Sequence, residues 1–122
     1  MEKISFNDFE KAMSYDVVNN NACIEVEFSI EDAEEYTSCW LGKMPDPETS
    51  KEIYWFGLVE DGSQAYDFDT FEQFASAKVF RTNCLKELWP LVFIYSIDGC
   101  DVEERLPYLL GLKKGQIQRP AK

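Results

Sequence analysis

The sequence of 122 residues contains no histidine, and this absence excludes a large part of enzyme chemistry. Without histidine, the chain lacks the usual general base for a serine or cysteine nucleophile and the commonest metal ligand. It also lacks the GxSxG motif of many serine hydrolases and the phosphate-binding loops GxxxxGK[ST] and GxGxxG. Catalysis is therefore disfavoured, and we expect no cofactor.

Long apolar runs are missing as well. No stretch approaches the roughly 18 apolar residues that a membrane-spanning helix needs. Residues 1–13, MEKISFNDFEKAM, are interrupted by charge and have no apolar core of the signal-peptide kind. We therefore expect a cytoplasmic protein without membrane contact.

The cysteines form no CxxC pair, and they are spread along the chain as Cys23, Cys39, Cys84 and Cys100. In a reducing cytosol, such cysteines are more often small buried apolar residues than disulfides. A zinc site would need all four thiols to converge without the usual paired spacing. We expect no metal.

Basic residues are scarce: 12 Lys and Arg stand against 23 Asp and Glu, a net charge of −11. Residues 113–122, KKGQIQRPAK, hold four of the basic residues and no acid, so residues 1–112 carry 8 basic and 23 acidic residues, net −15. We expect one domain over residues 1–112 and a basic tail after it. The negative charge of this domain predicts that it does not bind nucleic acid directly and that it attracts a basic protein surface. Solubility alone is an equally good explanation of such a surface.

Apolar spacing predicts four helices and several strands. The expected helices cover residues 5–15, behind a Ser5-x-x-Asp8 cap, and 70–78, behind a Thr70-x-x-Gln73 cap. Two more cover residues 85–89 and, behind Asp101-x-x-Glu104, residues 103–111, the last broken or kinked early by Pro107. The expected strands cover residues 23–28, 37–42, 52–59 and 91–97. Residues 29–36 suit either a strand or, behind a Ser29-x-x-Asp32 cap, a short helix; we prefer the helix.

Residues 61–72, DGSQAYDFDTFE, place side-chain oxygens almost as a calcium-binding EF-hand does. That loop needs glycine at its sixth position and a ligand at its fifth, where this chain has Tyr66 and Ala65. Asp61-Gly62 between two apolar stretches instead predicts a β-hairpin turn. With this hairpin, the sequence predicts an α+β fold, a mostly antiparallel sheet of four to five strands with helices packed chiefly on one face.

Two regions supply candidate binding residues. The loop Ser96–Asp101 follows an apolar strand and precedes a helix, and Asp98, Cys100 and Asp101 could in principle serve a metal or small molecule there. A plain turn at Asp98-Gly99, followed by Asp101 as a helix cap, explains the sequence of this loop better than a binding site does. The second region is aromatic and acidic, and its neighbouring strand residues face opposite ways. Its candidates for a binding surface, together with Asp98 and Asp101, are Trp40, Tyr54, Trp55, Phe56, Tyr66, Asp67 and Asp69.

The segments YWFGLVEDGSQAYDF (54–68), AKVF (77–80) and SIDGCDVEERLP (96–107) resemble a group of small bacterial proteins that have no assigned role. This resemblance covers somewhat under half of the chain and implies neither an activity nor a binding residue. In general character, being small, acidic and aromatic-rich, the chain is also similar to immunity proteins that neutralise bacterial toxins.

These observations favour a non-enzymatic module that binds a basic protein surface, for example an immunity protein that binds a basic toxin. The alternatives are a DNA mimic that inhibits a nucleic-acid-binding protein, and a metal-dependent or small-molecule function around Ser96–Asp101. The sequence predicts no oligomeric state.

Overall fold

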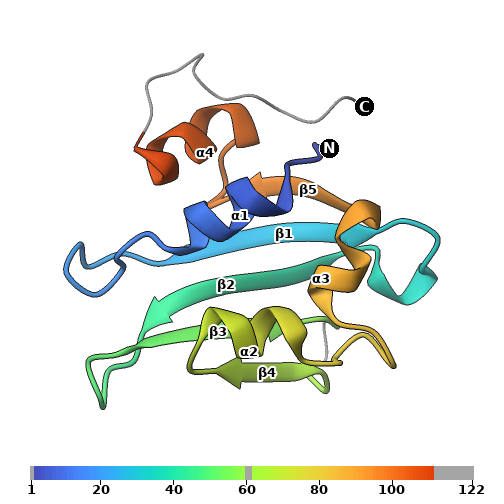
Figure 1. The fold of residues 1–122 in the computed structure, drawn as a ribbon, viewed down its shortest axis with the longest axis horizontal. Coiled ribbons are helices and arrows are strands. Elements are labelled where there is room, and N and C mark those ends of the chain that lie inside the picture. The colour runs from blue at the N-terminus through green and yellow to red at the C-terminus, as the bar shows by residue number, and fades with distance from the viewer. Residues whose placement is uncertain (1, 60–61, 112–122) are drawn as a thin grey trace.

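A computed structural model describes residues 2–59 and 62–111, which form an α+β fold around a five-stranded antiparallel sheet (Figure 1). The strand order is β4-β3-β2-β1-β5. The strands are β1 (Ile24–Ile30), β2 (Cys39–Pro45), β3 (Glu52–Gly57), β4 (Ala65–Phe68) and β5 (Val92–Ile97). The helices are α1 (Phe6–Met13), α2 (Phe71–Ser76), α3 (Leu85–Leu88) and α4 (Val102–Leu110), with 3₁₀ turns at η1 (Glu34–Tyr36) and η2 (Trp89–Leu91). The basic tail and Asp61 lie outside the described residues.

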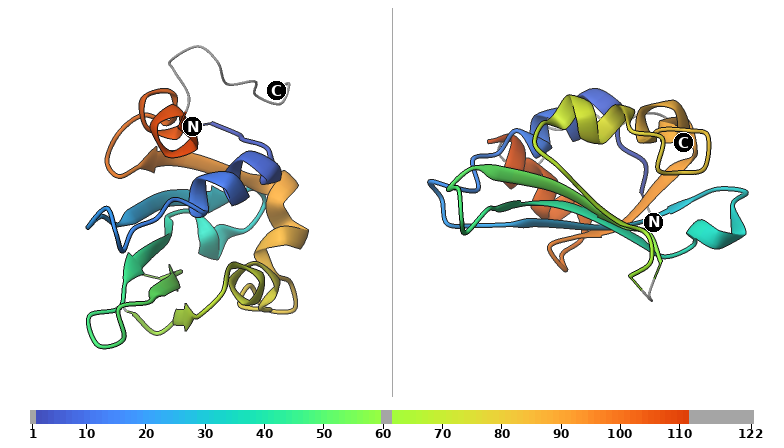
Figure 2. Two further views of the ribbon diagram at one scale, coloured as in Figure 1. Left: turned by 60° about the vertical axis from the view of Figure 1, so that its left-hand side comes forward. Right: turned by 90° about the horizontal axis from the view of Figure 1, so that it is seen from below.

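The helices α1, α2 and α3 lie on the same side of the sheet (Figure 2, right), and α4 packs against α1 and β5. Between helices and sheet lies an aromatic core. Phe56 of β3 stacks on Phe74 of α2 with ring centroids 4.3 Å apart, and Phe9 of α1 lies 4.4 Å from Trp89. The indole N–H of Trp89 donates a hydrogen bond to the carbonyl of Ile4, which satisfies its one polar group inside the core.

Lys43 of β2 ties the sheet to the end of α1. Its side chain points into the core and is 1% exposed. The ammonium group donates hydrogen bonds to the carbonyl oxygens of Met13 and Tyr15, both at 2.8 Å, and lies 3.0 Å from a carboxylate oxygen of Glu52. It also lies 5.2 Å from the ring centroid of Tyr54. A cation at this position satisfies carbonyls at the end of α1 and complements the negative end of the helix dipole.

The hydrogen bonds at the helix starts confirm two predicted caps. The side chain of Ser5 accepts from the backbone N–H of Asp8, and that of Thr70 accepts from the N–H of Gln73. The predicted cap at Ser29 is wrong. Ser29 pairs with Phe93 in the sheet, so β1 extends to Ile30 and residues 34–36 form only a 3₁₀ turn.

Of the expected break or kink at Pro107, the break does not occur. α4 continues to Leu110, because buried Leu106 and Leu109 anchor it and the proline removes only one intrahelical hydrogen bond. It ends at Gly111, whose φ of 68° is left-handed. The apolar strand expected over residues 91–97 is β5, which lies at one edge of the sheet. Its outer edge is partly covered by Glu2, which exchanges backbone hydrogen bonds with Ile94.

Replacing Lys43 by methionine tests the link between the sheet and α1. The variant keeps the apolar length of the side chain but leaves two carbonyls and the Glu52 carboxylate without their shared donor. We expect the free energy of unfolding to fall by about 2–3 kcal/mol, as for buried acceptors that lose their partner. Urea unfolding followed by circular dichroism measures it.

The matched control is Lys51→Met, at an exposed loop position. Its free energy of unfolding should change by no more than about 0.5 kcal/mol. Equal unfolding midpoints for the two variants would show that Lys43 does not hold the helical layer.

Candidate functional site

Strand alternation gives the sheet an inner face under the helices and an outer face that the described helices α1, α2 and α3 do not cover (Figure 2). Tyr54 and Phe56 point inward and are buried, while Trp55 between them points outward and is half-buried. We define the outer face by the outward-pointing side chains of β1 to β4. Its members are Glu25, Glu27, Trp40, Met44, Ile53, Trp55 and Asp67.

Trp55 lies flat on this face because the neighbouring strand presents a glycine beneath it. A Cβ atom placed on Gly42 would lie 2.6 Å from Cζ2 and 2.7 Å from Cε2 of Trp55, and would overlap the carbonyl oxygen of Ile24. Only a residue without a side chain fits there. On the other side of the ring, a Cβ on Gly57 would lie 3.9 Å from Cζ3, which is ordinary contact.

The register places acidic residues beside both tryptophans. In one cross-strand row, Glu25 is opposite Gly42, which is opposite Trp55, which is opposite Asp67. In the next row, Glu27 is opposite Trp40, whose side chain is 38% exposed. Residues directly opposite one another have Cβ atoms about 5 Å apart, so each indole has a carboxylate within side-chain reach.

The five strands contain a single basic residue, Lys43, and it points to the inner face. On the outer face, Glu27 accepts a hydrogen bond from the hydroxyl of Ser38 at 3.1 Å. At the β5 border, Lys3 lies 5.2 Å from the ring centroid of Phe93, and its ammonium group binds the carbonyl of Pro90. The outer-face carboxylates of β1 to β4 are therefore not neutralised by any cation of the same strands.

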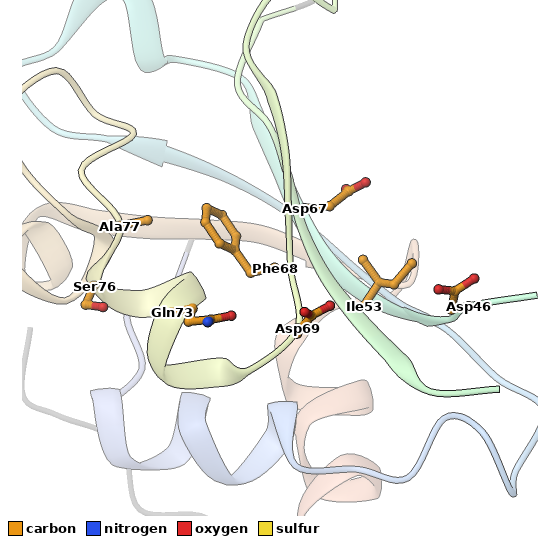
Figure 3. A pocket seen from close by; sticks show the side chains of 8 residues that line it. All are labelled: Asp46, Ile53, Asp67, Phe68, Asp69, Gln73, Ser76 and Ala77. Carbon is orange, nitrogen blue, oxygen red and sulfur yellow. The ribbon is translucent and has the colours of Figure 1, made fainter. Parts of the chain in front are cut away.

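A hollow of about 510 Å³ adjoins the outer face at the β4 edge (Figure 3). Figure 3 shows Asp67 and Phe68 pointing to opposite sides of β4. The backbone N–H of Glu48 and the hydroxyl of Thr49 bind the carboxylate of Asp46 and lower its pKa. The lining residues are Asp46, Ile53, Asp67, Phe68, Asp69, Gln73, Ser76 and Ala77.

The loop Ser96–Asp101 serves the architecture. Asp98 and Gly99 both have positive φ, 54° and 76°, and form a tight turn that returns the chain from Ile97 to Cys100. One carboxylate oxygen of Asp98 accepts from the backbone N–H of Glu25 at 2.8 Å, and the other from Nε of Arg105 at 2.7 Å. Asp98 thus joins β1 to α4, and its carboxylate has both oxygens engaged.

Two of the thiols illustrate the contrast between the core and the surface. Burial raises the pKa of Cys39 to about 12, so this thiol stays protonated. Cys23 is exposed at the start of β1, and its pKa is raised by partial desolvation and then by the negative charges of Glu25 and Asp98. Among the residues that the structure describes, no group of three or more Cys, Asp or Glu side chains is placed to hold a metal ion.

The structure brings together Trp40, Trp55 and Asp67, three of the residues named from the sequence. Tyr54 and Phe56 belong to the core, and Tyr66 is half-buried on the inner side of β4. Asp69 lines the hollow, and Asp98 and Asp101 belong to the turn before α4, where Asp101 occupies the N-cap position without a side-chain hydrogen bond.

Five residues of the site were not among the candidates: Glu25, Glu27, Met44 and Ile53 of the outer face, and Gly42 beneath Trp55. The alternation in CIEVEF does show that both glutamates share one face of a strand. No sequence pattern shows that Trp55 lies across Gly42, because that contact depends on the pairing of β2 with β3.

Comparison of the chain with protein-family models, curated proteins and solved structures finds no match. No helix within residues 2–59 and 62–111 has the length and apolar character that crossing a membrane requires.

Replacing Gly42 by alanine tests the flat position of Trp55. The added methyl group overlaps the indole and the strand backbone, so we expect the free energy of unfolding to fall by about 1–3 kcal/mol, as in overpacked sites. Gly57→Ala is the matched control and should change it by no more than about 0.5 kcal/mol. Urea unfolding measures both, and equal stability of the two variants would refute the packing of Trp55 on Gly42.

Alkylation of Cys23 by iodoacetamide at pH 8 reports the charge at this end of the outer face. Because the negative charge of Glu25 raises the pKa of Cys23, Glu25→Gln should lower that pKa and increase the thiolate fraction. The alkylation rate, measured by mass spectrometry of the Cys23 peptide, should therefore rise. Glu10→Gln, on exposed helix surface, should leave the rate unchanged; an unchanged rate in both variants would contradict the electrostatic assignment.

Proposed function

We propose that this chain is a non-enzymatic binding module whose outer face binds a basic protein. The observation that carries the proposal is the outer face itself, where Trp40 and Trp55 lie among Glu25, Glu27 and Asp67 without a cation from the same strands. Large aromatic residues are enriched at the centres of protein interfaces, where they supply much of the binding energy. Carboxylates around them attract and orient a cationic partner.

A sheet face that the helices do not cover suits a protein partner better than a small molecule. The helices α1, α2 and α3 lie on the opposite side of the sheet, and the adjoining hollow is bordered by carboxylates on one rim and by Gln73 and Ser76 of α2 on the other. Small-molecule sites are typically concave and mostly apolar. The most concrete form of the proposal is an immunity protein that neutralises a basic toxin by covering its surface.

A DNA mimic ranks second. Such a protein needs carboxylates in rows with phosphate-like spacing. On the outer face, indoles and glycines occupy the positions between Glu25, Glu27 and Asp67. This arrangement favours a partner that offers apolar as well as cationic contacts.

The proposal is tested with two triple variants that remove the same number of charges. One carries Glu25→Gln, Glu27→Gln and Asp67→Asn on the outer face. The other carries Glu10→Gln, Glu72→Gln and Glu104→Gln at exposed positions of the helices. The probe is a deca-lysine peptide, and its affinity is measured by calorimetry at 50 and 200 mM salt.

We expect the wild type and the helix triple to bind this peptide with affinity that falls at the higher salt concentration, because screening weakens exposed charge pairs. The outer-face triple should bind about tenfold more weakly at 50 mM salt, a loss of about 1.4 kcal/mol. Equal weakening by both triples would refute the outer face as the binding surface. The immunity form has its own readout, which is restored growth when the chain, but not its outer-face triple, is co-expressed with a basic toxin from an adjacent reading frame.

A further inference from the structure

The outer face offers one position where a packed aromatic ring and an exposed acidic residue lie in the same cross-strand row, on either side of a glycine. The indole of Trp55 extends from β3 across Gly42 of β2, with Cζ2 and Cε2 above the glycine. The next residue in that row is Glu25 of β1. Since neighbouring strands lie about 4.8 Å apart, Glu25 is one strand spacing beyond the glycine that the indole covers.

Both partners of this pair are available. Glu25 is exposed, and no hydrogen bond or ion pair with another described residue engages its carboxylate. Its backbone is fixed on both sides, by pairing with Gly42 and by the N–H donated to Asp98 at 2.8 Å. Trp55 is fixed as well, because the backbone and the ring are packed together at Gly42. The ring of Trp55 and the backbone of Glu25 are therefore held in place before any ligand arrives, which lowers the entropic cost of binding.

We propose that this position binds an arginine side chain of the basic partner, with the guanidinium group stacked on Trp55 and its N–H groups directed at Glu25. The inference rests on the proposed function and specifies which side chain of the partner the outer face selects. A guanidinium is planar, weakly hydrated and able to donate two parallel hydrogen bonds to a carboxylate. A lysine ammonium carries the same charge, but it has neither a flat face to stack on the indole nor two parallel N–H donors for the carboxylate.

Other occupants fit less well. An apolar side chain on Trp55 would remove water from Glu25 and Asp67 without giving their charges a partner. A second copy of this chain would bring its own Glu25, Glu27 and Asp67 against the same carboxylates, and residues 1–112 already carry a net charge of −15. A cationic group with a flat face satisfies the ring and the acids together.

The test uses the full chain and three capped pentapeptides, Gly-X-Gly-X-Gly, with arginine, lysine or the neutral isostere citrulline at X. Binding is followed by NMR through the indole N–H signals of the tryptophans, at 50 mM salt. We expect the arginine peptide to shift the Trp55 signal and to bind about fivefold more tightly than the lysine peptide, as a surface cation–π contact allows. The citrulline peptide should bind at least about tenfold more weakly than the arginine peptide.

Matched variants show which residues cause the preference for arginine over lysine. Trp55→Leu and Glu25→Gln should each reduce the ratio of arginine to lysine affinity to about one. Trp40→Leu, the same change on the same face, and Glu10→Gln, the same change on α1, should keep it. If Trp55→Leu alters the circular dichroism spectrum, Glu25→Gln carries the test, because its side chain is exposed and supports no packing.

Equal affinity of the arginine and lysine peptides for the wild type would overturn the arginine site, as would a preference that persists in Glu25→Gln. Neither result would affect the proposed function, which depends on the two triple variants and on deca-lysine. Failure of the proposed function would instead appear as equal weakening of deca-lysine binding by the two triple variants.

Discussion

The ammonium group of Lys43 holds the sheet and the helical layer together and also determines what the other side of the sheet presents. It reaches inward to the carbonyls of Met13 and Tyr15 and to Glu52. Side chains alternate along a strand, so an inward Lys43 requires outward Gly42 and Met44. A shift of β2 by one residue would bury Trp40 and Met44 and expose the lysine among the carboxylates. The acidic character of the outer face therefore depends on the same register that satisfies the end of α1.

The outer face combines rigidity with unbalanced charge. Because Gly42 has no side chain, Trp55 can lie along the sheet, where it covers the backbone of β2. The glutamates of β1 remain in water, where an unpaired carboxylate costs little folding free energy. They contribute to binding only when a cationic group comes near them. The stability of the fold comes from the opposite side, from aromatic contacts such as Phe56 on Phe74. Stability and binding thus use different faces of one sheet.

Sequence patterns predicted the parts of this fold that local chemistry controls. The caps at Ser5 and Thr70, the β-branched and aromatic strands and the turn at Asp98-Gly99 all depend on residues within a few positions of each other. The error at Ser29 arose because pairing with Phe93 outweighed a local cap. The last helix continues past Pro107 because burial of Leu106 and Leu109 outweighs one lost hydrogen bond. The loop position of Asp98, between an apolar strand and a helix, makes it a binding candidate from sequence, yet tertiary contacts with Glu25 and Arg105 engage its carboxylate.

By itself, the sequence determined the composition of the surface and the alternation along each strand: an acidic body, an α+β arrangement, and opposite orientations for Trp55 and its neighbours Tyr54 and Phe56. It did not determine which of these two sets faces the helices. That choice follows from long-range pairing, which places Gly42 beneath Trp55 and Glu25 beside it, although these residues are far apart along the chain. Only the folded sheet brings the ring and the carboxylate together, because register is set by the packing of a whole face against the core rather than by any local preference.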